Sequence, residues 1–468
     1  MPRRHRASLL ALFSLFSLFS LFSLFSLFSL TPGALAAQPP AAAPTATAAD
    51  PTPAVPAPAA PATPTAPAPD ARELFAQAMA AREAGDAAAY LARLEAAARV
   101  HPEPRQLGFR LAGALALAGR TDQALDRLDE MARLGIWRDL AAEPDFAPLR
   151  SSPRWAPLLR RFAALREHVG AGRVAFRLAE RDLLLEGIAH DPASGDFFLG
   201  SVHHGKVVRR RPDGMTSDFA RLAGLAPLGL AVDAPRGRLW TVAADLPQLA
   251  RRAEASRGST FLLAFDLSDG RELARVAPPG GPGQALNDLI VAGDGTVFVS
   301  DGQTGAVWAL APGAAALEPI LPPGELRSAG GLALDASGDR LLVADWSRGL
   351  AMVERHGGRW WRVTTPADLF PVGIDGLVAH RGGFVAIQNG FLPSRVLRFE
   401  LAPDGTAVTR FTVLERAHPD HVEPTLGVVV GDDLYYVANS QWEEFGEDGR
   451  PRAPERLAAP AVIRLPLR

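Results

Sequence analysis

The sequence predicts a multidomain protein in which an all-β six-bladed propeller follows a small α-helical domain. Two periodicities carry this prediction. Between residues 71 and 168, apolar residues recur at helical spacing, with similar turns 34 residues apart. From about Arg173 onward the apolar period falls to two, and one strand–turn–strand pattern recurs six times. The formal net charge is only −2, so the charge balance gives no reason to expect a nucleic acid partner.

Residues 1–37 have the organisation of an export signal. A basic start is followed by an apolar run of Ser-Leu-Phe triplets from Ala7 to Leu30, and then by small residues at Ala34 and Ala36. This pattern is typical of a secretory signal peptide and predicts a periplasmic or secreted protein. The apolar run is longer than usual, so an uncleaved membrane anchor is the alternative.

Residues 38–70 consist almost entirely of Pro, Ala and Thr. Such a composition cannot build a packed core, so we expect an extended linker between the signal and the folded domains. The chain has no cysteine, which excludes disulfides, thiolate zinc sites and a catalytic thiol.

Residues 71–168 predict the small helical domain. The turns "AGD" at Ala84 and "AGR" at Ala118 are 34 residues apart, and Pro102 lies where such a unit would end. The region resembles two tetratricopeptide repeats followed by a further helical segment. This resemblance implies a protein or peptide partner on the helical repeats, and a helical spacer that binds nothing is the alternative.

Residues 171–468 predict the propeller. The six repeats begin 42 to 59 residues apart and read EGIAHDPASGDFFLGS, LGLAVDAPRGRLWTV, NDLIVAGDGTVFVSD, GGLALDASGDRLLVAD, DGLVAHRGGFVAIQN and LGVVVGDDLYYVAN. Four short strands per unit at this period are typical of propeller blades. The last repeat runs out one strand short, so we predict that residues 173–179 supply its outer strand and close the ring.

The first strand of each blade lines the central channel of a propeller. Aligning the repeats places six residues at one equivalent position: Glu186, Leu228, Asn287, Gly330, Asp375 and Leu426. Three of them carry side-chain oxygens, and two converging carboxylates repel each other unless a cation or a shared proton lies between them. Oxygen ligands suit calcium, magnesium or manganese. A water-filled polar channel with solvated carboxylates is the alternative.

The blade openings "EG", "ND" and "DG", with GGLALDASGDRLLVAD between the last two, resemble those of the gluconolactonase/regucalcin family of six-bladed propellers. This resemblance implies a divalent cation, often calcium, at the channel mouth, and lactone hydrolysis. It implies Glu186 and Asp375 as metal ligands, with Asp375 also the catalytic acid/base. It implies Asn287 as a substrate contact or a substitute ligand.

Two positions depart from the family pattern. Gly330 stands where the family has a ligand Asn, and Ala285 stands where it has an Arg that contacts substrate. We therefore expect a weaker metal site, formed by Glu186, Asn287, Asp375 and water.

Loops after the second strands lie at the same mouth as Glu186. They carry Asn389 and Asn439, which we predict as further substrate contacts, and the pair His203–His204. The pair invites a metal interpretation, but adjacent strand residues point to opposite faces, which favours two solvated side chains.

Two further segments are expected at this mouth. His418 and His421 lie in the loop that enters blade six, where with Glu423 they would ligate a metal or shuttle protons, or be plain loop polarity. The Arg-rich insert at residues 245–259 would form a lid or an anion clamp, or a solvated excursion.

These observations favour an exported, monomeric, divalent-metal-dependent lactone or ester hydrolase. The alternative is a non-catalytic propeller that binds a small molecule or peptide at its mouth, with the helical domain recruiting a protein partner.

Overall fold

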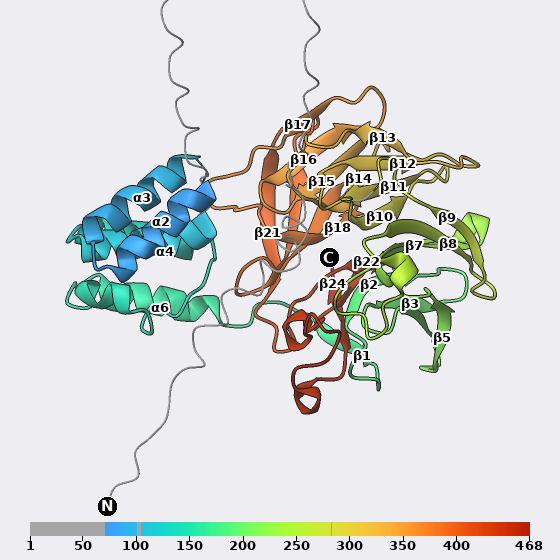
Figure 1. Cartoon of the computed structure of the whole chain (residues 1–468), viewed down its shortest axis with the longest axis horizontal. Coiled ribbons are helices and arrows are strands. Elements are labelled where there is room, and N and C mark those ends of the chain that lie inside the picture. The colour runs from blue at the N-terminus through green and yellow to red at the C-terminus, as the bar shows by residue number, and fades with distance from the viewer. Residues whose placement is uncertain (1–70, 101–103, 282) are drawn as a thin grey trace, which may run out of the picture.

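The computed structural model describes residues 71–100, 104–281 and 283–468. The predicted export signal and the Pro/Ala/Thr-rich linker lie outside the described residues. Within the described part of the chain, no helix is both long enough and apolar enough to cross a membrane. A group of helices lies beside a ring of sheets (Figure 1).

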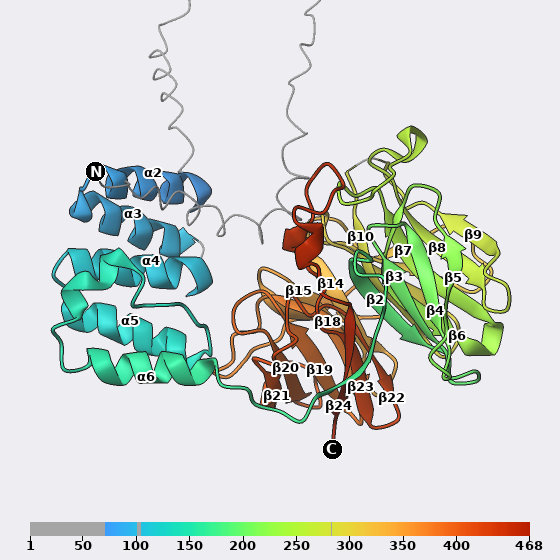
Figure 2. The ribbon, with the colours of Figure 1, turned by 90° about the horizontal axis from the view of Figure 1, so that it is seen from below.

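The helices precede the propeller in the chain. Their bounds are α2 (Ala71–Glu83), α3 (Ala87–Val100), α4 (Pro104–Leu117), α5 (Thr121–Arg133), the 3₁₀ helix η3 (Pro144–Leu149) and α6 (Trp155–Leu165). The five α-helices stack in chain order (Figure 2). Tyr90, Leu94, Leu128 and Phe146 are buried in their common core. Helices α2–α3 and α4–α5 form two hairpins at the predicted turns, and their identity as tetratricopeptide repeats stays a prediction.

The described strands form six four-stranded antiparallel sheets, and each sheet is one blade. The strands are β2 (Leu185–His190), β3 (Phe197–Ser201), β4 (Lys206–Arg210), β5 (Thr216–Arg221); β6 (Ala226–Asp233), β7 (Arg238–Ala244), β8 (Thr260–Asp266), β9 (Glu272–Val276); β10 (Leu286–Val291), β11 (Val297–Asp301), β12 (Val307–Leu310), β13 (Glu318–Leu321); β14 (Ala329–Leu334), β15 (Arg340–Asp345), β16 (Gly349–Glu354), β17 (Trp360–Arg362); β18 (Ile374–His380), β19 (Gly383–Gln388), β20 (Arg395–Leu401), β21 (Val408–Arg416); and β22 (Gly427–Val430), β23 (Asp433–Val437), β24 (Ala461–Pro466), β1 (Arg173–Arg177).

The six-bladed architecture is confirmed. Each inner strand contacts the inner strand of the next blade, and β22 contacts β2, so the ring closes on itself. The predicted closure is also confirmed, because β1 pairs with β24, with Val174 opposite Ile463. The outer strand of the last blade therefore comes from the segment just before the first blade.

A backbone irregularity marks the channel-lining position of the blades. In blades one to five, the pairing of the first two strands shifts register there, for example between Leu185 and Ile188. A bulge of this kind bends the strand and redirects its side chains. Hydroxyl groups of the second strands satisfy bulge carbonyls, as Thr241 Oγ1 does for Gly229 at 2.9 Å.

The glycine after the channel-lining residue has a packing role. A Cβ on Gly187 would lie 2.1 Å from the Leu228 carbonyl oxygen, and one on Gly331 would lie 2.5 Å from the Asp375 carbonyl oxygen. The inner strands of adjacent blades thus approach too closely for a larger residue. This contact accounts for the glycine in most repeats.

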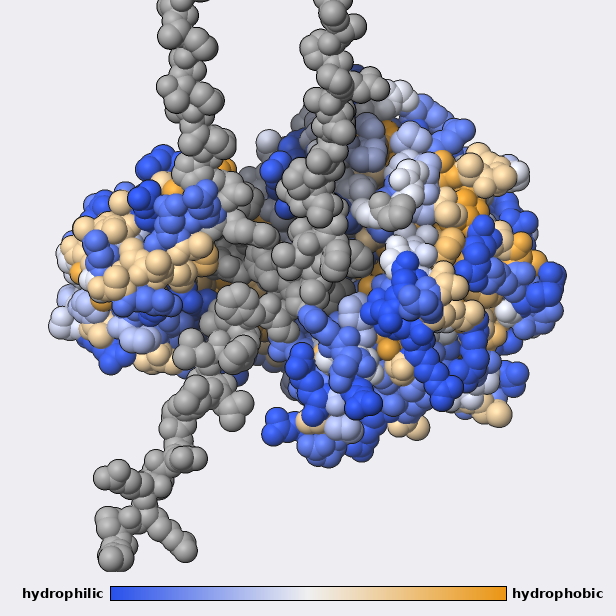
Figure 3. Space-filling view, in the orientation of Figure 1, coloured by the Kyte–Doolittle hydropathy of each residue, from blue (hydrophilic) through white to orange (hydrophobic). Residues whose placement is uncertain are grey.

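The helices pack against the fifth blade. Phe391, from the loop after β19, belongs to the helical core. The Trp137 backbone N–H donates to the Leu392 carbonyl at 2.7 Å. Arg395 on β20 is 3% exposed and donates from Nη1 to the Leu134 carbonyl at 3.1 Å. Hydrophilic residues cover much of the propeller face seen in Figure 3, with apolar residues between them.

Candidate functional site

The three predicted ligands occupy equivalent positions in three different blades. Glu186, Asn287 and Asp375 are each the second residue of an inner strand, in β2, β10 and β18. The residues before Glu186 and Asn287 pair with the last residues of the second strands, Ser201 and Asp301. The predicted repeat register therefore agrees with the observed pairing at this end of the channel.

Glu186 is buried and lies near another carboxylate. It is 7% exposed, and its Oε2 accepts a hydrogen bond from the Trp442 indole N–H at 2.9 Å. Burial raises the pKa of Glu186 well above its usual value, and the negative charge of Asp375 raises it further. The two side chains thus share the channel mouth although blades one and five are far apart in sequence.

Asn389 positions Asp375. Its Nδ2 donates to Asp375 Oδ2 at 2.7 Å and to the Pro424 carbonyl at 2.9 Å. Burial raises the pKa of Asp375 to about 6, and this hydrogen bond opposes the rise. The Asn389 Oδ1 is buried without a hydrogen-bond partner among the described residues, so an unused acceptor oxygen lies beside Asp375.

Asn287 faces the position where the family has its ligand Asn. A Cβ built on Gly330 would lie 3.7 Å from Asn287 Nδ2, with no contact shorter than 3.4 Å. Because Gly330 has no side chain, there is space beside Asn287 for a larger residue at position 330.

Two further carboxylates carry raised pKa values near the channel mouth, and the sequence analysis names only one of them, Glu423. Burial raises the pKa of Glu423 to about 7, and the charges of Glu443 and Asp375 add to the rise. Burial also raises the pKa of Asp288 to about 7. Asp288 stands where most repeats have the packing glycine, which is a visible signal. Glu423 precedes the sixth repeat, and the sequence associates it with the nearby histidines.

The donor set fits a hard divalent cation. Within the described part of the chain, no Arg or Lys forms an ion pair with Glu186, Asp288, Asp375 or Glu423. The buried Glu423 Oε2, like Asn389 Oδ1, has no hydrogen-bond partner among the described residues. Carboxylate and amide oxygens without a counter-charge are the ligands that calcium prefers.

Asn439 does not offer a substrate contact. Its Nδ2 donates to the Ala459 carbonyl at 3.2 Å, its Oδ1 accepts from the Ala461 N–H at 2.6 Å, and the residue is 3% exposed. Both amide atoms thus tie the last blade together, and we leave Asn439 out of the site.

The loop histidines bond or contact groups other than the carboxylates of the mouth. His418 neighbours His168, which bonds Glu415 through Nε2 at 2.5 Å. His421 Nε2 bonds the Tyr436 hydroxyl at 2.8 Å, and burial lowers the pKa of His421 to about 3. These rings join the helical domain to the last blades.

The insert at residues 245–259 packs onto the first blade. Arg252 donates from Nε to Asp245 Oδ1 at 2.6 Å, so this guanidinium is neutralised within the insert. The Ala250 N–H donates to the His203 carbonyl at 2.9 Å. These bonds hold the first half of the insert against the turn that carries His203.

Fold and site together define a six-bladed propeller whose channel mouth carries buried carboxylates and amides. No family model and no curated protein matches the sequence. Similar solved structures include a gluconolactonase from Xanthomonas campestris, with 20% identity, a TM-score of 0.45, and coverage of 65% of this chain and 93% of that one. A regucalcin from Agrobacterium tumefaciens, titled a calcium-binding protein, has 17% identity, a TM-score of 0.46 and coverage of 63% and 93%.

A third similar structure is the PQQ-bound aldose sugar dehydrogenase of Streptomyces coelicolor, with 15% identity, a TM-score of 0.45 and coverage of 64% of this chain and 98% of that one. These neighbours differ in activity, and the likeness is distant. The chemistry of this chain therefore rests on its own residues.

Proposed function

We propose that this protein binds a divalent cation, calcium in the first instance, at the channel mouth and hydrolyses a lactone or ester there. The observation that carries the proposal is the equivalent position of Glu186 and Asp375 on inner strands of the closed ring, where the charge of Asp375 raises the pKa of Glu186. Burying such a pair without a counter-charge is costly. Glu186, Asn287 and Asp375 would hold the cation.

A bound cation would polarise the substrate carbonyl and acidify an attacking water. The chain itself supplies the base. Asp375, whose pKa is raised by burial, would accept the proton of the attacking water as a positioned general base. Asn389 holds one oxygen of Asp375, and Trp442 holds one oxygen of Glu186. Both carboxylates are thereby oriented before substrate binds.

A non-catalytic ligand-binding propeller is the second candidate function. The specific observation in its favour is Ala285, which supplies only a methyl group where the resemblance implies a substrate-contacting Arg. A propeller of this kind would bind cation and a small molecule or peptide but leave the ester bond intact.

We further propose export through the N-terminal segment, with retention as a membrane anchor the alternative, and a protein or peptide partner for the helical domain. A groove of about 510 Å³ along α3, α4 and α5 supports the partner. Its lining includes Glu95, Arg127 and Glu130, which would favour a partner with charges of both signs.

The test is hydrolysis of a panel of sugar lactones and aryl esters by cation-stripped full-length protein, before and after addition of calcium. We expect activity only with the cation, and loss of at least about 100-fold in Asp375→Asn, since a positioned base contributes about 10²–10⁴-fold. The control is Asp339→Asn, which removes an exposed carboxylate at the opposite end of the blade. Calcium binding without hydrolysis of any substrate would favour the second candidate.

A further inference from the structure

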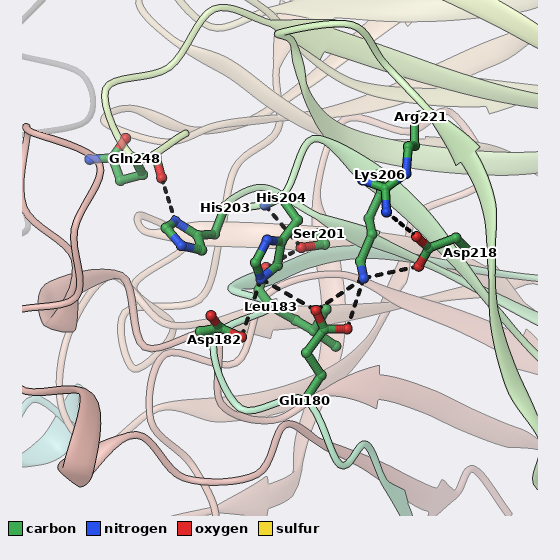
Figure 4. A network of polar contacts seen from close by, with 10 residues as sticks. All are labelled: Glu180, Asp182, Leu183, Ser201, His203, His204, Lys206, Asp218, Arg221 and Gln248. Atoms are coloured by element: carbon green, nitrogen blue, oxygen red, sulfur yellow. Dashed lines mark hydrogen bonds and ion pairs between the residues drawn. The ribbon is translucent and has the colours of Figure 1, made fainter. Parts of the chain in front are cut away.

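A second cluster of ligand-type side chains lies at the edge of the first blade. The ligand atoms of Asp182, His203 and His204 all lie within 4.8 Å of one another, and Figure 4 shows the surrounding network. The two histidines occupy the turn after β3 rather than the strand itself. The sequence predicts that the two rings point to opposite faces. In the structure they lie side by side instead, with 4.7 Å between ring centroids.

His203 is oriented as a metal ligand. Its Nδ1 lies 2.9 Å from the Gln248 carbonyl oxygen, and because a carbonyl only accepts, Nδ1 carries the proton and Nε2 keeps its lone pair. A histidine that donates one ring N–H to a carbonyl is the usual second-shell arrangement of metal ligands. His203 is 5% exposed, so the surrounding side chains hold its ring in this orientation.

His204 faces two carboxylates. Its Nε2 lies 3.2 Å from Asp182 Oδ1 and 3.4 Å from Glu180 Oε1, yet it makes no hydrogen bond within the described chain. Ligand atoms about 2.0–2.1 Å from a tetrahedral zinc are about 3.3 Å apart. The two spacings at His204 match the edges of such a ligand set, and the ligand atom of His203 lies within 4.8 Å of those of Asp182 and His204.

The local charge also favours a cation. Glu180, Asp182 and Asp218 give three negative charges, and the nearby Lys206 and Arg221 give two positive ones, which leaves one negative charge. Lys206 bonds Glu180 at 2.8 Å and Asp218 at 2.9 Å. Asp218 would keep Lys206 paired if Glu180 turned toward a metal.

We propose that Asp182, His203 and His204 bind a zinc-class transition-metal ion, with Glu180 turning in from outside this group as a fourth ligand. Imidazole nitrogens select zinc over calcium, so this rim site differs in chemistry from the channel mouth. One segment separates the two sites: Trp442 bonds Glu186, and Phe445 packs at a tilt against His203, with 4.9 Å between ring centroids.

The experiment is calorimetric titration of Zn²⁺ into the chelator-stripped full-length protein. We expect one high-affinity zinc ion per chain, and a loss of at least about tenfold in affinity for His204→Gln and for Asp182→Asn. Asp182→Asn keeps the shape of a half-exposed side chain, so it separates ligand loss from misfolding. Its calcium affinity should stay that of the wild type, which distinguishes failure of the rim site from failure of the channel-mouth site.

The matched control is His168→Gln, from the other histidine–carboxylate group of the described residues, His168, Glu415 and His418. That group is satisfied internally, since the Gly172 N–H donates to Glu415 Oε2 at 2.8 Å and the Asp420 N–H donates to His418 Nδ1 at 3.1 Å. Unchanged zinc affinity in His168→Gln supports the rim site. Equal zinc affinity in the wild type, His204→Gln and Asp182→Asn, or loss in His168→Gln instead, would overturn it.

Discussion

At the residue scale, the surroundings of Glu423 at the channel mouth disfavour ionisation of its carboxyl group. Its folded-state pKa is about 7, above the usual 4.5, chiefly because of burial. A carboxyl group with a raised pKa contributes stability below its unfolded pKa, and this contribution is lost as pH rises through the folded value. The stabilising contribution of Glu423 is therefore complete below about pH 4.5 and is lost between about pH 4.5 and 7.

We predict that Glu423→Gln becomes progressively more stable than the wild type as pH rises from 4.5 to 8. One pKa unit corresponds to about 1.4 kcal/mol, and since Glu423 keeps some exposure we expect a gain of about 1–3 kcal/mol at pH 8. Urea unfolding at both pH values, with divalent cations chelated, measures this difference. A gain of equal size at both pH values would show that the charge is not the cause.

Gly330 offers a gain-of-function test. A Cβ there meets only ordinary van der Waals contacts, the shortest being 3.4 Å to the Ala344 carbonyl oxygen. We predict that Gly330→Asn raises calcium affinity about tenfold, because it adds an oxygen ligand beside Asn287. The control is Gly331→Asn, whose Cβ would lie 2.5 Å from the Asp375 carbonyl and which should destabilise the fold instead. Equal calcium affinity in Gly330→Asn and wild type would place the cation elsewhere.

Among the structural elements, β1 decides whether the ring closes. Phe176 on β1 packs against Phe197, with 5.4 Å between ring centroids, and the Arg210 guanidinium lies 4.1 Å above its ring. We predict that Phe176→Ala lowers the free energy of unfolding by about 1–3 kcal/mol, since the ring is only partly buried. The neighbouring exposed Ala175→Ser should change it by less than about 0.5 kcal/mol. Denaturant unfolding measures both, and similar values would mean that β1 is not part of the closed ring.

The inner strands explain why much of the fold could be predicted. The glycine of "EG" and "DG" is fixed by contact with the next blade, so the repeat reveals the register and with it the position of Glu186 and Asp375. The partners of these residues could not be predicted in the same way. Trp442 reaches Glu186 from an excursion after β23 that no repeat contains. Contacts of this kind depend on ring closure rather than on local spacing.

The misjudged positions have local causes. The strand before His203 ends at Ser201, and the alternation of a strand does not extend into a turn. Asn439 follows a second strand, as the sequence predicts for a mouth residue, and the backbone of the next segment takes both of its amide atoms. A side chain at the correct end of a blade is not necessarily free.

At the scale of the whole molecule, Arg395 couples the two domains. Its Nε donates to Gln388 Oε1 at 2.6 Å and its Nη1 to the Leu134 carbonyl. Burial lowers its pKa to about 10, so it remains charged at neutral pH. We predict that Arg395→Met lets the helical domain melt before the propeller and splits the calorimetric transition in two. Arg398→Met, on the same strand and bonded to His380, should leave the number of transitions unchanged.

The central claim is that carboxylates from distant blades form one cation site. Its most direct test is calorimetric titration of calcium into chelator-stripped wild type, Glu186→Gln and Asp375→Asn. The proposed site predicts one calcium ion per chain in the wild type and a loss of at least about tenfold in affinity, or about 1.4 kcal/mol, in either variant. Equal calcium affinity in all three proteins would contradict it and leave these buried carboxylates to share a proton instead.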